Sequence, residues 1–345
     1  MPAPVAEATA MFREAATAAA ALRAQARLNG AVLAALGQVL RSRPPRAVVT
    51  CARGSSDHAA TYAKYLIETR TGVLTASAAP SVSSVYQSAQ RLQDCLFIAI
   101  SQSGRSPDLI ASTRAAAASG AITLALVNAA DSPLARAVHH CLPLHAGPEL
   151  SVAATKSYIA TLGALVALVA EWTRDAGLRA AFEAAPALLE QAWGLDWSGA
   201  LPALVSASHL YVIGRGLGLG VAQELALKCK ETCGLHAEAF SGAEVRHGPQ
   251  ALLDPRFGAL LLAQHDPTHD GIEALGADLA ARGVRVLAAG CVPRGAQLLP
   301  TLAADPAIEP LLLVQSGYRL IARLAVARGH DPDRPPYLAK ITETH

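Results

Sequence analysis

The chain has 345 residues, more than twice the usual domain length of roughly 150, so a single small module is excluded. Hydrophobic residues make up 52% and charged residues only 16%, which excludes a disordered chain and predicts a large buried core. The 29 basic and 27 acidic residues leave a net charge of +2, so we expect neither nucleic acid nor an acidic membrane as the main partner. The longest apolar stretches are too short for a membrane-spanning helix.

The cysteines and the first residues of the chain favour a cytoplasmic protein. The six cysteines form no CxxC pair and lie mostly in apolar strings, which predicts reduced thiols in the core. The N-terminal alanine-rich run has no basic start and is interrupted by charged residues, so we expect no secretory signal.

In chain order, residues 5–40 are predicted to form one alanine-rich helix that ends before Pro44. The first half then contains predicted strands at 47–51, 95–100 and 122–127, with helices at 57–68 and 108–119. Because strand and helix alternate, the sheet should be parallel. A helical stretch over 157–192 joins this half to the next.

The second half repeats this order. Strands are predicted at 209–213, 259–263, 284–288 and 310–314, and helices at 219–233, 271–282 and 317–328. Arg53-Gly54 and Arg215-Gly216 occupy matching places after the first strand of each half. The fold class is therefore α/β, with an internal duplication of one flavodoxin-like unit. We expect an N-terminal helix over 1–40 and domains over 41–192 and 193–345.

Two hydroxyl-rich turns follow neighbouring strands of the first half. At the carboxyl ends of parallel strands, helix N-termini present unpaired N–H groups that attract anions. Serine hydroxyls can donate to a phosphate without adding charge, and glycine lets the backbone approach closely. Serines also commonly cap helices, but two such turns favour a phosphate site. The predicted phosphate-binding residues are Gly54, Ser55, Ser56, Ser101, Gln102, Ser103 and Ser106. The glycine-rich turn 214–220 is only weak evidence for a dinucleotide site.

The helix after Gly220 carries Glu224, Lys228 and Glu231 at i, i+4 and i+7, which places all three on one face. A solvated salt-bridged face is the ordinary interpretation. However, the neighbouring residues are apolar, so the helix has little surface to expose. His247, followed by Gly-Pro, is an acid–base candidate. Lys340, one of only five lysines, lies in an extended tail that could fold back over the site.

At these residues the sequence resembles a known family. The strings CARGSSDH (51–58), ISQSGRSPD (100–108), AGPELSVAATKSY (146–158), ALKCKETCGLHAEAFSGAEVRHGP (226–249) and PPYLAK (335–340) are similar to the isomerase half of glutamine:fructose-6-phosphate amidotransferase. They resemble the stand-alone sugar-isomerase (SIS) type of glucosamine-6-phosphate deaminase more closely still. The resemblance covers nearly the whole chain and implies two tandem SIS domains.

The resemblance also implies roles for individual residues. Glu231 matches the carboxylate that moves a proton between C1 and C2, and Lys228 and Glu224 match its partners. His247 matches the ring-opening histidine, usually lent by the other subunit of a homodimer, and Lys340 matches the tail lysine that meets the sugar carbonyl. The family positions that hold the sugar phosphate are matched by Ser56, Ser101, Gln102, Ser103 and Ser106. The string that lines the sugar pocket contains Val152 and Ala154. Ala154 replaces the family's serine, so the sugar preference is open.

These observations predict a glucosamine-6-phosphate deaminase that binds a hexosamine or hexose 6-phosphate and needs no metal or organic cofactor. The absence of room for a glutaminase domain before residue ~45 favours deamination over amidotransfer. Three alternatives stay open: the same chemistry on galactosamine 6-phosphate, an aldose-ketose isomerase or aminotransferase-type SIS enzyme, and a non-catalytic sugar-phosphate sensor.

Overall fold

The structure is a computed structural model that describes residues 5–340, and its chain forms two compact units. Within the described residues, the N-terminal sheet unit consists of Ala20–Glu149, Ser157–Glu183 and residues 339–340. The C-terminal sheet unit consists of residues 5–19, Leu150–Lys156 and Ala184–Leu338. Each unit is therefore discontinuous in sequence. The predicted limits of the two domains, 41–192 and 193–345, stay a prediction.

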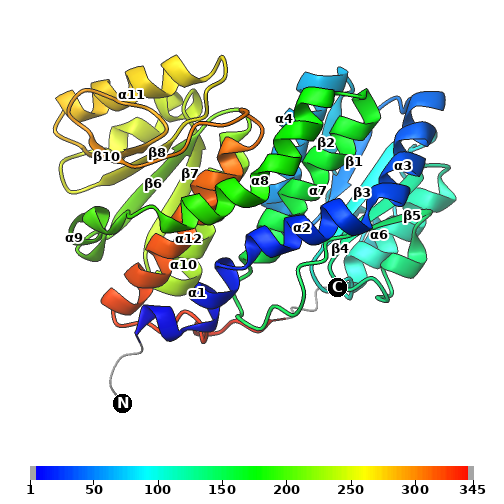
Figure 1. Cartoon of the computed structure of the whole chain (residues 1–345), viewed down its shortest axis with the longest axis horizontal. Coiled ribbons are helices and arrows are strands. Elements are labelled where there is room, and N and C mark those ends of the chain that lie inside the picture. Colours follow the sequence, from blue (N-terminus) through cyan, green and yellow to red (C-terminus); the bar gives the residue numbers. More distant parts are fainter. Residues whose placement is uncertain (1–4, 341–345) are drawn as a thin grey trace. The chain divides into compact units, whose positions relative to one another are not determined.

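The N-terminal sheet unit contains five strands, all paired in parallel, in the order β2-β1-β3-β4-β5 (Figure 1). The strands are β1 Val48–Cys51, β2 Thr75–Ser77, β3 Leu96–Ser101, β4 Ile122–Val127 and β5 His140–Pro143. The helices that begin in the connections of this half are α4 Ser55–Thr71, α5 Pro80–Ser84, α6 Pro107–Ala118 and α7 Lys156–Thr173. Every residue of the central strand β3 is buried, as expected for a strand covered on both faces.

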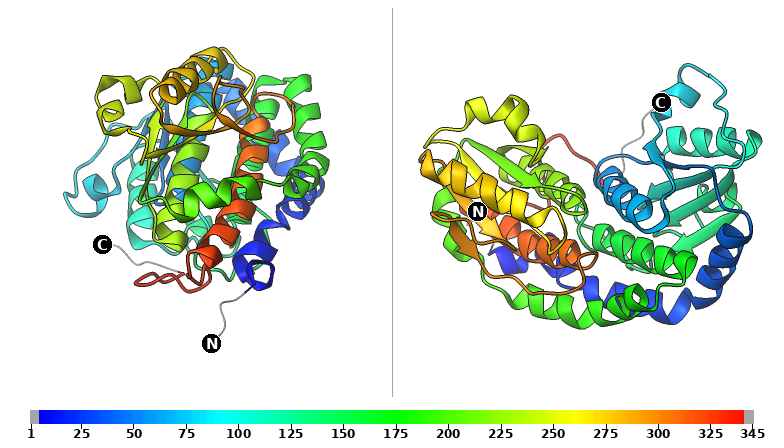
Figure 2. Two further views of the ribbon diagram at one scale, coloured as in Figure 1. Left: turned by 90° about the vertical axis from the view of Figure 1, so that its left-hand side faces the viewer. Right: turned by 90° about the horizontal axis from the view of Figure 1, so that it is seen from above.

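The C-terminal sheet unit repeats this topology with the order β7-β6-β8-β9-β10. Its strands are β6 His209–Gly214, β7 His236–Ser241, β8 Gly258–Leu262, β9 Arg285–Ala289 and β10 Gln297–Leu299. Its helices include α9 Leu201–Val205, α10 Gly218–Cys233, α11 His269–Ala281 and α12 Glu309–Ala327. Figure 2 shows helices on both faces of each sheet. The shared order is the flavodoxin-like 2-1-3-4-5, so the predicted fold class and duplication are confirmed.

The prediction of one helix over residues 5–40 is wrong. The described segment contains a short 3₁₀ turn, η1 Ala6–Ala8, and three helices, α1 Ala10–Ala15, α2 Ala18–Leu28 and α3 Gly30–Ser42. One break falls at Asn29, whose side-chain amide donates to the Pro143 carbonyl at 2.9 Å and whose oxygen contacts His145 Nε2 at 2.9 Å. Alanine-rich composition predicts helix everywhere here, but this tertiary bonding interrupts it.

The strand predicted at 310–314 is also wrong, because these residues begin α12. Leu311, Leu312, Leu313 and Val314 are all buried. A short apolar run is ambiguous between a buried strand and a buried helix, and Pro310 fits the first turn of a helix well. Similarly, the helical stretch predicted over 157–192 is divided between α7 and α8 Ala176–Gly194.

All six cysteines are free, and five are buried, as predicted from their apolar surroundings. Burial is the main factor that raises the pKa of the Cys51 thiol to about 12, so this side chain stays protonated and unreactive near neutral pH.

Among residues 5–340, we find no helix with the length and hydropathy that crossing a membrane requires.

Candidate active site

Helix α10 brings together two carboxylates and one ammonium group. Lys228 Nζ lies 2.6 Å from Glu231 Oε2 and 3.4 Å from Glu224 Oε1. The side chains of Glu224 and Lys228 are 0% and 1% exposed, whereas that of Glu231 is 21% exposed. The predicted stripe is thus a buried cluster with one accessible end, and not a solvated salt-bridged face.

The local sequence explains why these charges are buried. Helix α10 begins at Gly218 and ends before Gly234, which adopts the left-handed conformation (φ 57°) typical of a helix C-terminus. It packs against β6, β7 and α12, so most of its residues are buried. The cluster therefore lies on a helix with almost no free face, which makes the charges costly unless they compensate one another.

The charge of Lys228 is maintained by its two neighbours. Burial alone would lower the pKa of the Lys228 ammonium, but the charges of Glu224 and Glu231, together with hydrogen bonds to both carboxylates, outweigh it. The net result is a pKa raised above the usual value of 10.5. Lys228 is therefore a permanent cation beside Glu231 near neutral pH.

This raised pKa has a defined effect on stability. A group whose pKa is higher in the folded state contributes its full stabilisation below its unfolded pKa and loses it as the pH rises through the folded pKa. We use the double variant Glu224→Gln/Lys228→Met as the reference, because it leaves no uncompensated buried carboxylate that titrates. We expect the difference in unfolding free energy between the wild type and this variant to stay constant from neutral pH up to about pH 10.5 and to narrow only above it. Urea unfolding across this range measures the difference. Narrowing that begins at neutral pH would show that the pKa is lowered.

A third residue that supports the cluster comes from α12. The hydroxyl of Tyr318, which is fully buried, donates to Glu224 Oε1 at 2.9 Å. The hydrogen bond fixes the carboxylate that is farther from solvent. Sequence reasoning missed Tyr318 because the two residues are 94 positions apart and no local spacing signals the contact.

The two serine-rich turns leave the same edge of the first sheet. Strands β1 and β3 are paired in parallel, so both turns follow their carboxyl ends. Arg53 of the first turn joins them, because its Nη2 lies 2.9 Å from Oδ2 of the buried Asp108 at the start of α6. The predicted phosphate residues are therefore gathered at one edge. The Arg53–Asp108 pair was not singled out from the sequence.

The second turn has a defined backbone that leaves hydroxyl hydrogens for donation. Ser101 Oγ accepts a hydrogen bond from the Gly104 N–H at 3.0 Å, and Ser103 Oγ accepts one from the Arg105 N–H at 3.3 Å. A serine oxygen that accepts a bond still has its own O–H to donate. Ser106 occupies the N-cap position of α6 but its side chain makes no capping hydrogen bond. Helix capping therefore does not explain Ser106.

Replacement of Gly104 by alanine should damage this turn. Gly104 has φ +62°, and an added Cβ would overlap Ser132 Oγ and lie 2.6 Å from Ser132 Cβ. We expect Gly104→Ala to lower the unfolding free energy by about 1–3 kcal/mol and to weaken binding of a sugar phosphate. Gly30→Ala is the control, because Gly30 has open space around its Cβ position. Equal stability and binding in both variants, measured by urea unfolding and calorimetry, would contradict this expectation.

Comparison with known proteins identifies the family. The model described as "SIS domain" matches residues 43–171 and 203–291, which together make up more than half of the chain. The chain belongs to the SIS domain family. A glutamine–fructose-6-phosphate aminotransferase (isomerizing) of Thermus thermophilus is 34% identical over 333 residues, which cover 88% of this chain and 53% of the relative. The chain thus spans about half the length of the curated relatives it matches.

Solved structures of SIS proteins agree with the fold. A candidate phosphosugar isomerase from Silicibacter pomeroyi has a TM-score of 0.91 and 41% identity, covering 94% of this chain and all of that one. The glucosamine-6-phosphate deaminase of Thermotoga maritima has a TM-score of 0.75 and 21% identity, covering 97% of this chain and all of that one. At 21% identity, the second likeness shows a shared fold alone.

The remaining predicted residues of this SIS protein lie on loops. His247 is exposed at the end of a 3₁₀ turn, η4 Glu244–His247. Val152 and Ala154 are half-buried in the loop between β5 and α7. The end of the tail is different, because Lys340 Nζ lies 3.5 Å from the buried carboxylate of Glu149 in the same unit. The sequence string 146–158 contains Glu149, but sequence reasoning assigned it no role.

The glycine-rich turn 214–220, which follows β6, is contacted by the side chain of Gln264. Gln264 Nε2 donates to the Arg215 carbonyl and to Asp266 Oδ2, both at 2.8 Å. A Cβ added to Gly218 would lie 2.5 Å from Gln264 Oε1. The lack of a side chain at Gly218 therefore makes room for Gln264. This explanation needs no dinucleotide, and it agrees with the sequence analysis, in which the turn was only weak evidence for a dinucleotide site.

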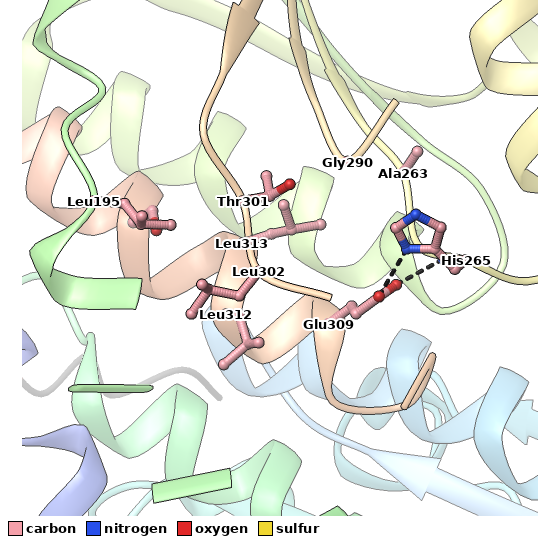
Figure 3. Close-up of a pocket in the computed structure, with 10 residues that line it drawn as sticks. Leu195, Ala263, His265, Gly290, Thr301, Leu302, Glu309, Leu312 and Leu313 are labelled. Carbon is pink, nitrogen blue, oxygen red and sulfur yellow. Dashed lines mark hydrogen bonds and ion pairs between the residues drawn. The ribbon is translucent and has the colours of Figure 1, made fainter. Parts of the chain in front are cut away.

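Two of the concave regions of the C-terminal sheet unit contain no predicted site residue. One cavity, drawn in Figure 3, is lined by His265 and by Glu309, which accepts hydrogen bonds from the backbone and ring of His265. Its volume of about 10 Å³ is too small for a sugar phosphate. A wider groove of about 650 Å³ is lined by His209, Tyr211 and Phe257, among others. Neither region shares a residue with the α10 cluster or the serine-rich turns.

Proposed function

We propose that the protein is a glucosamine-6-phosphate deaminase, an SIS enzyme that isomerises an amino-sugar phosphate and releases ammonia. The observation that carries this proposal is the buried ammonium of Lys228, 2.6 Å from the partly exposed carboxylate of Glu231. Such a pair offers a proton acceptor next to a fixed positive charge. Acid–base isomerisation of a sugar requires the proton acceptor, and the positive charge stabilises the intermediate that forms.

The proposed reaction converts glucosamine 6-phosphate and water into fructose 6-phosphate and ammonia. After the ring opens, the carboxylate of Glu231 takes the proton from C2, and the electron pair of that C–H bond forms the C1–C2 double bond. At the same time the π pair of the C1 carbonyl moves to O1, which takes up a proton, and the C2 nitrogen gives one up when the imine forms. The carboxylic acid returns the proton to C1, which leaves a C2 imine. Water then adds to C2 and the C–N bond breaks, releasing ammonia. Lys228 stabilises the negative charge that develops on the intermediate.

We also propose a role for each of the other candidate residues. The turns at 54–56 and 101–106 would hold the phosphate, His247 would open the ring, and Lys340 would meet the sugar carbonyl. Val152 and Ala154 would contact the sugar. These assignments are supported by the gathering of the two turns at one sheet edge and by the family resemblance. We further propose a cytoplasmic homodimer in which His247 serves the partner's site.

A second candidate function is the isomerase reaction of an aminotransferase-type SIS enzyme, which forms glucosamine 6-phosphate from fructose 6-phosphate and ammonia. It is favoured by the 34% identity with the Thermus thermophilus aminotransferase. The same cluster serves both directions, since each requires proton movement between C1 and C2.

An ammonia assay on purified protein tests the proposal. The panel contains glucosamine 6-phosphate, galactosamine 6-phosphate and fructose 6-phosphate with added ammonium. We expect release of ammonia from glucosamine 6-phosphate with the highest kcat/KM of the panel. Amino-sugar formation without measurable release would favour the second function. Thermal stabilisation by hexose phosphates without any turnover would favour a sensor and overturn both enzymatic assignments.

A further inference from the structure

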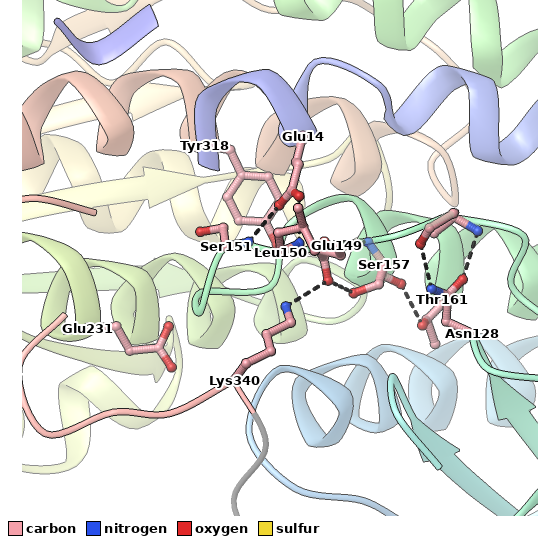
Figure 4. Close-up of polar contacts among 12 residues, drawn as sticks. Glu14, Asn128, Glu149, Leu150, Ser151, Ser157, Thr161, Glu231, Tyr318 and Lys340 are labelled. Carbon is pink, nitrogen blue, oxygen red and sulfur yellow. Dashed lines mark hydrogen bonds and ion pairs between the residues drawn. The ribbon is translucent and has the colours of Figure 1, made fainter. Parts of the chain in front are cut away.

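A carboxylate outside the α10 cluster is fully buried next to the tail lysine. The side chain of Glu149 is 0% exposed and lies in the loop that precedes α7. Its Oε1 accepts the N–H of Ser157 at 3.1 Å, and its Oε2 accepts the Ser157 hydroxyl at 2.5 Å. Figure 4 shows these contacts converging on the carboxylate.

The position of Glu149 suits a charged carboxylate. Ser157 is the second residue of α7, an 18-residue helix, so its N–H is one of the donors that the helix leaves unpaired. A negative charge at a helix N-terminus is stabilised by the helix dipole. Removal of this carboxylate from water is nevertheless costly unless a cation compensates it. The Lys340 ammonium, 3.5 Å from Oε2, supplies that cation.

The tail that carries Lys340 has little regular structure to fix it. Beyond α12 and up to Lys340, the chain forms turns and extended segments without a helix or strand. One anchor of the tail lies within the C-terminal sheet unit, where the Asp333 carboxylate accepts the N–H groups of Ala10 and Met11 at 2.6 and 2.8 Å. The contact of Lys340 with Glu149 is a further anchor, within the N-terminal sheet unit.

We infer that Glu149 is a positioning residue that holds the Lys340 ammonium in one place at the end of the tail. The Lys340 side chain is 25% exposed, so part of it stays accessible while its ammonium lies 3.5 Å from the buried carboxylate. A long flexible lysine on an irregular tail would otherwise sample many positions. Two hydrogen bonds from Ser157 fix the carboxylate, and the carboxylate fixes the lysine.

Chemical labelling tests the contact without reference to activity. The chain has only five lysines, so acetylation by a brief pulse of an amine-reactive ester can be measured at Lys340 by mass spectrometry, with exposed Lys64 as the internal reference. We expect Glu149→Gln to increase the labelling rate of Lys340 several-fold and to leave that of Lys64 unchanged. The matched control is Glu183→Gln, which removes an exposed carboxylate from α8 and should change neither rate.

A second variant keeps the test decisive if Glu149→Gln does not fold. Ser157→Ala preserves the charge of Glu149 but removes the hydroxyl that fixes it. We expect a smaller increase in Lys340 labelling in this variant. If Ser157→Ala and every folded Glu149 variant label at the wild-type rate, Glu149 does not hold the lysine and the inference is overturned.

The catalytic consequence rests on the proposed deaminase function. A misplacement of a reacting group by about 1 Å can cost about 10²-fold in rate, so we expect Glu149→Gln to lower kcat by this order with little change in KM. Glu149→Asp, which keeps the charge, should recover part of the loss. If the wild type releases no ammonia, the proposed function fails while the labelling result still decides the role of Glu149. Normal kcat in Glu149→Gln with active wild type would refute the positioning role.

Discussion

The Glu231→Gln variant is expected to release ammonia from glucosamine 6-phosphate about 10²–10⁴-fold more slowly than the wild type. This is the usual contribution of a general acid–base group. The amide has nearly the same shape as the carboxylate but cannot accept the C2 proton. Lys228 would keep one carboxylate partner, Glu224, at 3.4 Å. We therefore expect sugar phosphate binding, measured by calorimetry, to remain close to that of the wild type while kcat falls.

Glu238→Gln is the matched control for this experiment. Glu238 is an exposed residue of β7 in the same unit, and its replacement removes a carboxylate outside the cluster. It should retain wild-type kcat. A Glu231→Gln enzyme with activity within a few-fold of the wild type would exclude Glu231 as the base.

Replacement of Lys228 by methionine should destabilise the protein by about 3–5 kcal/mol, the usual effect of removing one partner of a buried ion pair. Methionine has a similar length, so the packing of α10 is largely preserved. The loss arises because Glu224, which is 0% exposed, would lose the cation beside it. The hydroxyl of Tyr318 also contacts this carboxylate, but one neutral hydrogen bond does not offset a buried charge.

Urea unfolding of the single and double variants measures this effect. We expect the double variant Glu224→Gln/Lys228→Met to recover much of the stability lost in Lys228→Met, because it removes the uncompensated charge. The recovery is a coupling that a double-mutant cycle quantifies. Additive losses in the two single variants would show that the pair is not energetically coupled.

The sequence was sufficient to predict the α10 cluster because helical spacing is a local property. Glu224, Lys228 and Glu231 share a face in any regular helix, and their apolar neighbours indicate that this face is buried. The parallel sheets and their duplication were also predicted, since alternation of strands and helices is visible along the chain. The serine-rich turns could be placed at one edge from the strand order alone.

The parts that could not be predicted depend on contacts between distant residues. Tyr318 reaches Glu224 across 94 positions, and Lys340 reaches Glu149 across 191. No spacing rule links such pairs. The error at 310–314 has a different cause, because Leu311–Val314 has the composition of a buried strand and only its packing as part of α12 decides between the two. The roles of the site residues stay predictions.

Isotope exchange in D₂O tests the central claim most directly, since it reports proton movement at the sugar carbons. Glucosamine 6-phosphate is incubated with the enzyme in D₂O, and the recovered substrate and product are examined by NMR. We expect the wild type to introduce deuterium at C1 of fructose 6-phosphate or at C2 of the remaining substrate, and Glu231→Gln to introduce essentially none. A C1 hydrogen that does not come from the solvent must come from C2, so substrate deuterated at C2 is also incubated in H₂O. Exchange or C2-to-C1 transfer by Glu231→Gln at the wild-type rate would contradict proton transfer by Glu231.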